Sequence, residues 1–461
     1  MALYKAFICI LLFTINASLI LCQTSRQLDA SISNREQSTL PSSLLQPTNF
    51  GGPPTFSTLQ SSTISPAATQ AMLQSFRKIS EGAQQFSMDL FTKFSEIFDR
   101  SNAKADLMIS PFSVWALLLL LVEGSAGNTL NELRKTLHID TDQQALRNAF
   151  SVVQKYLTIN TNTIEVASLQ AVFSDINQPV DRDFESVIER YYGSVIITTD
   201  FHDVVSTFNL INKLVKEATR GLINHTVSSK DLENANSFLV SSLFFKGQWK
   251  YPFNRTITRP EMFYDESGNP IGEVSMMVQE ANFNFAGINE LEAHVLELPY
   301  GKENRLSMLV ILPRKGVTTH KVVQNLRSYG ISNIFQKLNE SKIGYEEENV
   351  EVLFPKFSTS SDFKMMPILQ EMGMNDIFDP AVANLSKISN NFFVSSIIHT
   401  TKIVVDEEGT TAAAITGSVL ANKATPPKFY LNRPFIYLIM EKKTNLLLFA
   451  GWIKNPNNYK Y

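Results

Sequence analysis

Apolar residues follow two different periods along this chain, a helical one in the front half and a strand-like one in the rear half. The segments FSMDLFTKFSEIF (86–98) and LRNAFSVVQKYL (146–157) have the spacing of amphipathic helices. Runs rich in β-branched and aromatic residues, which indicate strands, are SVIITTDF (194–201), SFLVSSLFF (237–245), RLSMLVILP (305–313), KFYLNRPFIYLIM (428–440) and NLLLFAGWI (445–453). Helices and strands do not alternate as βαβ units, so the pattern predicts an α+β domain with large antiparallel or mixed sheets.

The first 22 residues are predicted to be a secretory signal peptide. Lys5 supplies the positive start, and residues 6–13 form a short apolar stretch that polar residues then interrupt. A membrane anchor would need about 20 uninterrupted apolar residues, which this segment lacks. Cleavage is predicted after Cys22, with a cut near Ala17 as the alternative. We therefore expect a secreted, extracellular protein with no membrane partner.

Residues 23–82 are predicted to be a disordered extension. Ser, Thr, Gln and Pro dominate this stretch, so it offers too little apolar surface to offset the entropy of ordering. A passive spacer, an O-glycosylated segment and a docking motif are all compatible with this composition. No internal repeat and no Pro/Gly/Ser-rich linker follows, so a single domain is predicted to fill residues 83–461.

The composition argues against several function classes. With 461 residues, 44% of them hydrophobic, the chain can build a sizeable core, and a net charge of −3 gives no global attraction to nucleic acid. Both cysteines, Cys9 and Cys22, lie in the predicted signal peptide, so the mature chain can form no disulfide. The histidines form no HExxH pair, and the GxSxG, GxxxxGK[ST] and dinucleotide motifs are missing. We expect no metal, no cofactor and no enzymatic activity.

One stretch is unusual for a surface loop. Residues 409–422, GTTAAAITGSVLAN, carry no charge, proline or aromatic side chain, and they lie between Glu408 and Lys423. Small uncharged side chains suit a segment that enters a β-sheet, where a charge would be buried without a partner. The alternate residues that would face inward are Thr410, Ala412, Ala414, Thr416 and Ser418. A helix or a flexible linker is the competing interpretation, because alanine favours helices.

The sequences around this stretch resemble the serpin family. VVDEEGTTAAAITG (404–417) is similar to the family's hinge, and ISPFSVWALLLLLVEGSAGNT (109–129) to its helix B and the turn after it. VSSLFFKGQWKYPF (240–253) and FPKF (354–357) resemble strands of its sheet A, and NRPFIYLIMEKKTNLLLFAGWIKNP (432–456) the closing hairpin of its sheet B. The motifs recur in family order from about residue 84 to residue 456. The resemblance implies the α+β serpin fold, with about nine helices, three β-sheets (A, B and C) and an exposed reactive-centre loop.

The resemblance also implies a mechanism and a bait bond. A serpin of this type is a suicide inhibitor: a serine protease cleaves its loop, becomes acylated, and is trapped as the loop inserts into sheet A. Family spacing places the scissile residue 14 positions after Gly409 and 11 before Pro434, and both distances lead to Lys423, with Ala424 beyond the cut. A lysine suits the acid-based pocket of a trypsin-like protease.

Other positions match family roles residue by residue. The hinge is implied at Glu407, Glu408, Gly409, Thr410, Thr411, Ala412, Ala413 and Ala414. The breach, at the top of sheet A, is implied at an ion pair between Glu407 and Lys356, beside Trp249. The shutter, a polar cluster beneath sheet A, is implied at Ser110, Ser113, Ser241 and His399. Ser241 departs from the family's usual Asn, and its single hydroxyl offers fewer hydrogen bonds than an amide.

The expected partner is an extracellular trypsin-like serine protease of a clotting, melanisation or immune cascade, bound covalently by a monomeric inhibitor. Glycosylation is predicted at four sequons, which begin at Asn224, Asn254, Asn339 and Asn384. A glycosaminoglycan cofactor would find a sparse basic set, which a solvated helix face explains equally well, at Arg134, Lys135, Arg147 and Lys155. The alternative function is a non-inhibitory serpin acting as carrier, storage protein or chaperone. Such members often have charged or bulky hinge residues, which residues 410–414 lack.

Overall fold

The computed structural model describes residues 66–224, 226–233, 235–344, 349–409 and 426–458. Nine α-helices occur within these residues: α3 (Pro66–Arg100), α4 (Pro111–Gly124), α5 (Gly127–Thr136), α6 (Gln143–Leu157), α7 (Arg182–Val187), α8 (Val204–Ala218), α9 (Thr319–Tyr329), α10 (Ile331–Gly344) and α11 (Met366–Glu371). Short helical turns add η3 (Ile188–Tyr192), η4 (Ser229–Leu232), η5 (Arg255–Ile257), η6 (Asp376–Phe378) and η7 (Pro456–Asn458). None of the described helices has the length and apolar composition that a membrane crossing requires.

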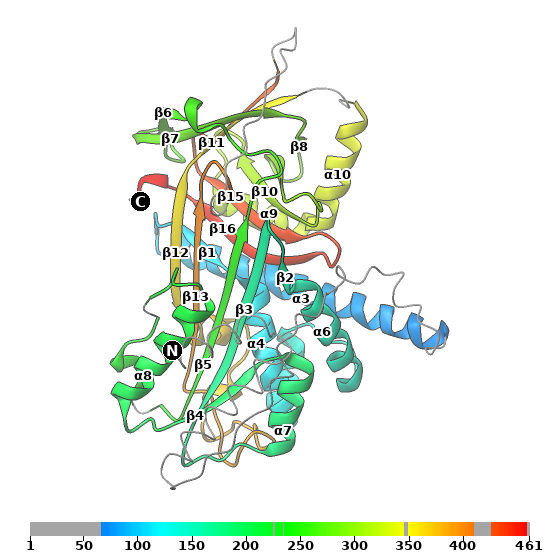
Figure 1. The fold of residues 1–461 in the computed structure, drawn as a ribbon, viewed down its shortest axis with the longest axis vertical. Coiled ribbons are helices and arrows are strands. Elements are labelled where there is room, and N and C mark those ends of the chain that lie inside the picture. Colours follow the sequence, from blue (N-terminus) through cyan, green and yellow to red (C-terminus); the bar gives the residue numbers. More distant parts are fainter. Residues whose placement is uncertain (1–65, 225, 234, 345–348, 410–425, 459–461) are drawn as a thin grey trace, which may run out of the picture.

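Three sheets organise the strands (Figure 1). Sheet A runs β12 (Phe357–Lys364), β13 (Ser396–Val405), β5 (Ser237–Gly247), β3 (Ile164–Asp175) and β2 (Ile159–Asn160), and β4 (Val195–Thr199) also pairs with β3. Sheet B runs β1 (Leu107–Ile109), β16 (Leu446–Ile453), β15 (Phe435–Glu441), β10 (Leu306–Pro313), β9 (Ala293–Tyr300) and β8 (Asn284–Ile288). Sheet C runs β14 (Lys428–Tyr430), β11 (Val350–Pro355), β7 (Pro270–Ala281) and β6 (Arg259–Tyr264). The α+β architecture predicted from the sequence is confirmed.

Helix α3 begins earlier than the sequence predicted. It starts at Pro66, and Phe76 and Ile79 lie in the main core together with Ala83 and Phe86. These four residues are spaced three and four apart, which places them on one face of a helix. The predicted boundary at residue 83 therefore falls inside this helix, and the described core includes residues from Phe76 onward. The polar composition concealed the helix, because its apolar face is narrow at this end.

Sheet A is covered on both faces, which explains why its central strand β5 is almost wholly buried. On one face lies α4, all fourteen residues of which are buried. On the other face, Ile211 and Val215 of α8 pack in a second core with Phe238 and Val240 of β5. A strand buried on both faces carries apolar side chains in both alternating positions. Sheet A is thus a layer between two helical surfaces.

Two neighbouring strands of sheet A are parallel and pair over only part of their length. Strands β13 and β5 form five residue pairs, from Ser396 with Phe238 to Thr400 with Ser242. Beyond these pairs, residues 401–405 of β13 and 243–247 of β5 do not pair with each other, and the two strands diverge (Figure 1). Each of these halves is paired on its other edge, with β12 and with β3. The unpaired edges define a slot between β13 and β5, which we call the upper slot.

Candidate functional site

A tight turn lies at the open end of the upper slot. Strand β13 ends at Val405, and the chain reverses within residues 406–409. The N–H of Asp406 donates to the carbonyl of Gly409 at 3.0 Å, and the N–H of Gly409 donates back at 3.3 Å. The side-chain Oδ1 of Asp406 accepts hydrogen bonds from the N–H groups of Glu408 (3.0 Å) and Gly409 (3.2 Å). Asp406 thus closes the turn with both its backbone and its side chain.

Gly409 occupies a position that no other residue fits. Its φ is +134°, and a Cβ there would lie 2.1 Å from the carbonyl oxygen of Gly247. The close approach arises because Gly409 forms an antiparallel bridge with Gln248, directly beyond the end of β5. A glycine is required where the backbone adopts positive φ and another backbone approaches this closely. The last described residue of the hinge is therefore already aligned along the edge of β5.

Trp249 holds the turn from the β5 side. Its backbone N–H donates to the carbonyl of Glu408 at 2.9 Å, and its indole Nε1 donates to the carbonyl of Asp406 at 3.0 Å. The indole ring stacks on Tyr300 with centroids 4.4 Å apart. Phe253 adds a further N–H, which donates to the carbonyl of Glu407 at 2.7 Å. The sequence resemblance implied that Trp249 lies beside the breach ion pair, and its two hydrogen bonds anchor the hinge backbone.

Glu407 and Lys356 form the ion pair that the sequence resemblance implied. The Lys356 Nζ lies 2.8 Å from Glu407 Oε2, and Thr258 Oγ1 donates to Glu407 Oε1 at 2.8 Å. Burial by itself would raise the pKa of Glu407, but the hydrogen bonds from Lys356 and Thr258 outweigh it and hold the pKa below its ordinary value. The carboxylate is thus kept ionised, and it joins the hinge to Lys356, between β11 and β12, and to the segment after β5. Thr258 gave no sequence signal.

The four predicted shutter residues form one connected cluster. Ser110 caps α4, and its Oγ accepts the N–H of Ser113 at 3.4 Å. The hydroxyl of Ser113 donates to the carbonyl of Ser110 at 3.0 Å and accepts from Ser241 Oγ at 2.9 Å. The N–H of Ser110 donates to Nε2 of His399 at 2.8 Å. Ser241 therefore reaches α4 with its short side chain, and the cluster joins α4 to both strands below the upper slot.

His399 is neutral in this cluster. It is fully buried in β13 and pairs in register with Ser241 of β5. Because the Ser110 N–H can only donate, Nε2 must carry no proton, which places the ring proton on Nδ1. Burial disfavours the imidazolium and lowers the pKa of His399 to about 4. Protonation of His399 would therefore oppose the contact that ties α4 to β13.

The comparisons with known proteins agree with this geometry. A model of the family described as serpin (serine protease inhibitor) matches residues 81–456. The chain belongs to the serpin family. Serpin B11 of Mus musculus is 30% identical over 405 residues, which cover 82% of this chain and 99% of the relative.

Two solved structures illustrate the likeness of fold. The thermophilic serpin tengpin in its native state has a TM-score of 0.71 and 26% identity, over 86% of this chain and 95% of that one. Thyroxine-binding globulin in complex with thyroxine has a TM-score of 0.71 and 24% identity, over 82% and 99%. At that identity, the second structure speaks for the fold alone.

The bait bond predicted for this serpin lies outside the described residues. Lys423 and Ala424 fall in the range 410–425, as do the hinge positions from Thr410 to Ala414. The described chain resumes at residue 426 and enters β14, which pairs in parallel with β11 of sheet C. The assignment of the bait bond to Lys423–Ala424 stays a prediction from the sequence.

The four sequon asparagines of the serpin are all exposed at the surface. Asn254 accepts the hydroxyl of Thr256 at 2.8 Å, and Asn384 accepts the hydroxyl of Ser386 at 2.9 Å. Asn339 lies on α10 and Asn224 follows α8. Exposure meets the steric requirement for a glycan, and glycosylation stays a prediction at each site.

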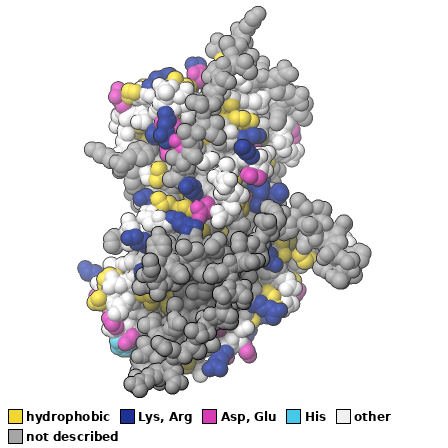
Figure 2. All heavy atoms as spheres, viewed as in Figure 1, with side chains coloured by type: hydrophobic (Ala, Val, Ile, Leu, Met, Phe, Trp, Pro, Cys, Tyr) yellow, Lys and Arg dark blue, Asp and Glu magenta, His cyan; other side chains and the backbone are white. Residues whose placement is uncertain are grey.

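Two of the four basic residues weighed for a glycosaminoglycan have internal partners. Arg147 forms an ion pair with the buried Glu123 at 2.7 Å, and Arg134 donates to the carbonyl of Thr141. The hydrogen bonds that Arg147 donates to the Glu123 carboxylate raise the pKa of Arg147. Figure 2 shows basic and acidic side chains interspersed over the coloured part of the face in view. These contacts give Arg134 and Arg147 a role in holding the fold together, which does not require a glycosaminoglycan.

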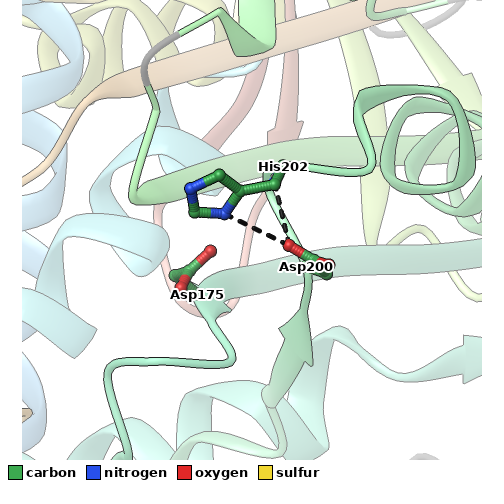
Figure 3. Close-up of side chains that lie close together, drawn as sticks. All are labelled: Asp175, Asp200 and His202. Carbon is green, nitrogen blue, oxygen red and sulfur yellow. Dashed lines mark hydrogen bonds and ion pairs between the residues drawn. The ribbon is translucent and has the colours of Figure 1, made fainter.

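Asp175, Asp200 and His202 form a group with donor atoms close enough together to hold a metal ion (Figure 3). Asp175 is buried, and its carboxylate accepts the N–H of Asn177 at 2.9 Å and the N–H of Phe201 at 3.1 Å. His202 Nδ1 lies 3.3 Å from Asp200. These backbone hydrogen bonds give the buried carboxylate of Asp175 a structural role, because they join the end of β3 to the loop after β4.

Proposed function

We propose that this serpin is a secreted suicide inhibitor of trypsin-like serine proteases, with Lys423–Ala424 as its bait bond. The observation that supports it best is the relation between the hinge turn and the upper slot. Strands β13 and β5 are parallel, and the turn at residues 406–409 reverses the direction of the chain at the open end of the slot between them. A strand that continued from Gly409 would be antiparallel to both neighbours and would pair with both unpaired edges.

The hinge sequence suits this slot. Thr410, Ala412 and Ala414 would face one side of the new strand, and none carries a charge or bulk. Above the shutter, the slot is bordered by buried side chains such as Phe245 and Val405. A charged side chain entering there would lose its hydration without gaining a partner. Serpin loop insertion is an established example of strand addition.

The proposed chemistry begins as an ordinary acyl transfer. The protease serine Oγ attacks the carbonyl carbon of Lys423, the bond to the nitrogen of Ala424 breaks, and the new amine leaves with a proton from the protease's general acid. Lys423 then remains bound to the protease as an ester. Insertion of residues 410–423, at ~3.3 Å each, would carry this ester roughly 46 Å. At about 1 kcal/mol per net hydrogen bond, the new strand supplies on the order of ten kcal/mol to distort the protease.

The bait residue supports a trypsin-like target. Lys423 is the one basic residue between Lys402 and Lys428. A flexible ammonium group suits a deep pocket with a carboxylate at its base. The predicted signal peptide and the sequons support an extracellular site of action, in a cascade such as clotting, melanisation or immunity.

A carrier role is the second candidate, because thyroxine-binding globulin shares the fold and is solved with thyroxine bound. The two functions differ in whether a protease is consumed. Incubation of the secreted protein with trypsin should yield a covalent complex that survives denaturing electrophoresis, and mass spectrometry should locate the bond at Lys423. Lys423→Ala should lose the complex while its thermal unfolding stays unchanged, because the proposed function places Lys423 at the surface, where substitutions shift stability by about 0.5 kcal/mol or less. Cleavage without any complex would favour the carrier.

A further inference from the structure

Arg255 contacts the hinge from a turn that the family motifs did not single out. It begins η5, whose preceding residue Asn254 caps the turn by accepting the N–H of Thr256 at 3.0 Å. The Arg255 NH2 group lies 2.7 Å from Oε1 of Glu408. Thr258, three residues further on, donates to Glu407. One short segment therefore binds both acidic side chains of the hinge.

Glu408 depends on this contact because it is buried. Its exposed fraction is 6%, and within the described residues its second oxygen Oε2 is buried without a hydrogen-bond partner. Arg255 is the cation that balances this carboxylate among the described ion pairs, although its own side chain is 59% exposed. A buried carboxylate that loses its only cation is left uncompensated, which is costly. Without Arg255, Glu408 would be driven toward solvent and would pull the turn with it.

The position of Gly409 follows from that of Glu408. The carbonyl of Glu408 accepts the N–H of Trp249, and the next residue, Gly409, bridges to Gln248 in the antiparallel sense. The chain reversal that a new strand requires is thus complete in the intact protein. Closing a turn orders several residues before any pairing rewards it. Insertion that starts from a formed turn needs only the addition of successive pairs.

We propose that Arg255 is a positioning residue for loop insertion: through Glu408 it holds Gly409 at the entrance of the upper slot and thereby sets the insertion rate. This inference rests on the proposed function. Apart from Asp406, which closes the turn itself, the residues that hold the turn are 249–258 and Lys356, and all of them lie outside the inserting segment. Because these contacts hold the formed turn and do not involve the inserting segment, we expect their loss to slow insertion and not to release the loop.

The test compares Arg255→Ala with Arg259→Ala. Arg259 is a matched control, because it pairs with Glu261 on β6 and does not contact the hinge in the described structure. For Arg255→Ala, we expect the number of inhibitor molecules consumed per trapped trypsin to rise about fivefold, while the rate of the first loop cleavage is unchanged. Arg255→Ala/Glu408→Gln should return toward the parent, because a neutral amide needs no cation. An unchanged stoichiometry in Arg255→Ala, or no recovery in the double variant, would overturn the proposal.

A readout without protease separates this inference from the proposed function. Loop insertion as proposed predicts that gentle heating of the intact protein drives some uncleaved loop into sheet A and yields a heat-resistant form. Arg255→Ala should form this product more slowly than Arg259→Ala, whereas a synthetic peptide of residues 410–422 should anneal to both at equal rates. Faster conversion, or an equal change in peptide annealing, would show that Arg255 only stabilises the top of the sheet. A parent that converts but traps no protease would refute the proposed function and leave the role of Arg255 testable by this rate.

Discussion

The backbone N–H of Ser110 donates to Nε2 of His399 at 2.8 Å, which joins the start of α4 to the middle of β13. The contact lies at the point where β13 and β5 stop pairing, since His399 and Thr400 form the last two pairs. It therefore lies just beneath the place where a new strand would have to separate the two strands. This makes the protonation state of His399 a determinant of the stability of sheet A.

Acid should destabilise the native protein through His399. The pKa of His399 is lowered from 6.5 to about 4, so the unfolded state binds a proton that the native state refuses. The contribution of neutral His399 to the free energy of unfolding is therefore fully present above pH 6.5. It is lost as the pH falls toward 4, by up to about 1.4 kcal/mol per pH unit. Urea unfolding between pH 7.5 and 4.5 measures this slope.

His399→Gln is the comparison for this pH dependence, because other groups also titrate. Burial and the nearby Arg314 and Arg433 lower the pKa of His294 as well, and His294 is present in both proteins. Glu407, whose pKa is also lowered, contributes at more acidic pH, below its ordinary value of 4.5. If parent and His399→Gln lose stability in parallel between pH 6.5 and 4.5, His399 is not the responsible group.

Gly409→Ala should disable the hinge turn. The added Cβ would lie 2.1 Å from the carbonyl of Gly247 at a φ of +134°, so the turn must move. We expect a loss of ~2 kcal/mol or more in native stability and a higher proportion of cleaved, untrapped inhibitor. Gly316→Ala is the control, because Gly316 has a φ of +84° with open space around its Cβ position. Equal effects of the two substitutions would show that backbone strain alone, and not the contact with β5, explains the result.

Thr410→Arg should convert the inhibitor into a substrate. Thr410 is the first side chain that would turn inward during insertion, and a guanidinium group there would be buried without a partner. Insertion should slow while the protease hydrolyses its ester at an unchanged rate, so the Lys423–Ala424 bond is cut without trapping. Thr411→Arg, one residue further on, would face the opposite side and should keep more of the inhibition. Gel-based partition between trapped and cleaved product measures both.

Residues before and after Pro66 should contribute differently to the stability of the protein. Phe76 and Ile79 are core residues of α3, so Phe76→Ala should cost about 3 kcal/mol. Deletion of residues 23–65, whose composition is polar, should leave thermal unfolding and inhibition largely unchanged. A large loss of stability upon that deletion would show that the polar part also packs against the domain.

The sequence predicted the fold and the breach through motifs, and it missed contacts that only tertiary structure creates. Lys356, Glu407 and Trp249 stand in recognisable motifs, and the structure brings them together. Arg255 and Glu408 lie far apart in the chain, and no local pattern distinguishes this arginine from a solvated one. The helical start at Pro66 was missed for a different reason. The first turns of α3 contain few apolar residues, so their polar composition indicated an extension and their helical spacing was too weak to predict a helix.

Hydrogen exchange across the upper slot tests the central claim most directly. The amides of residues 243–247 and 401–405 should be followed by mass spectrometry in the intact protein and after cleavage at Lys423. Every second residue on each facing edge presents its N–H to the slot. Cleavage should protect these amides by at least tenfold, together with residues 410–422, because a new strand pairs with both edges. Unchanged exchange in both segments after complete cleavage would contradict loop insertion as the mechanism of this serpin.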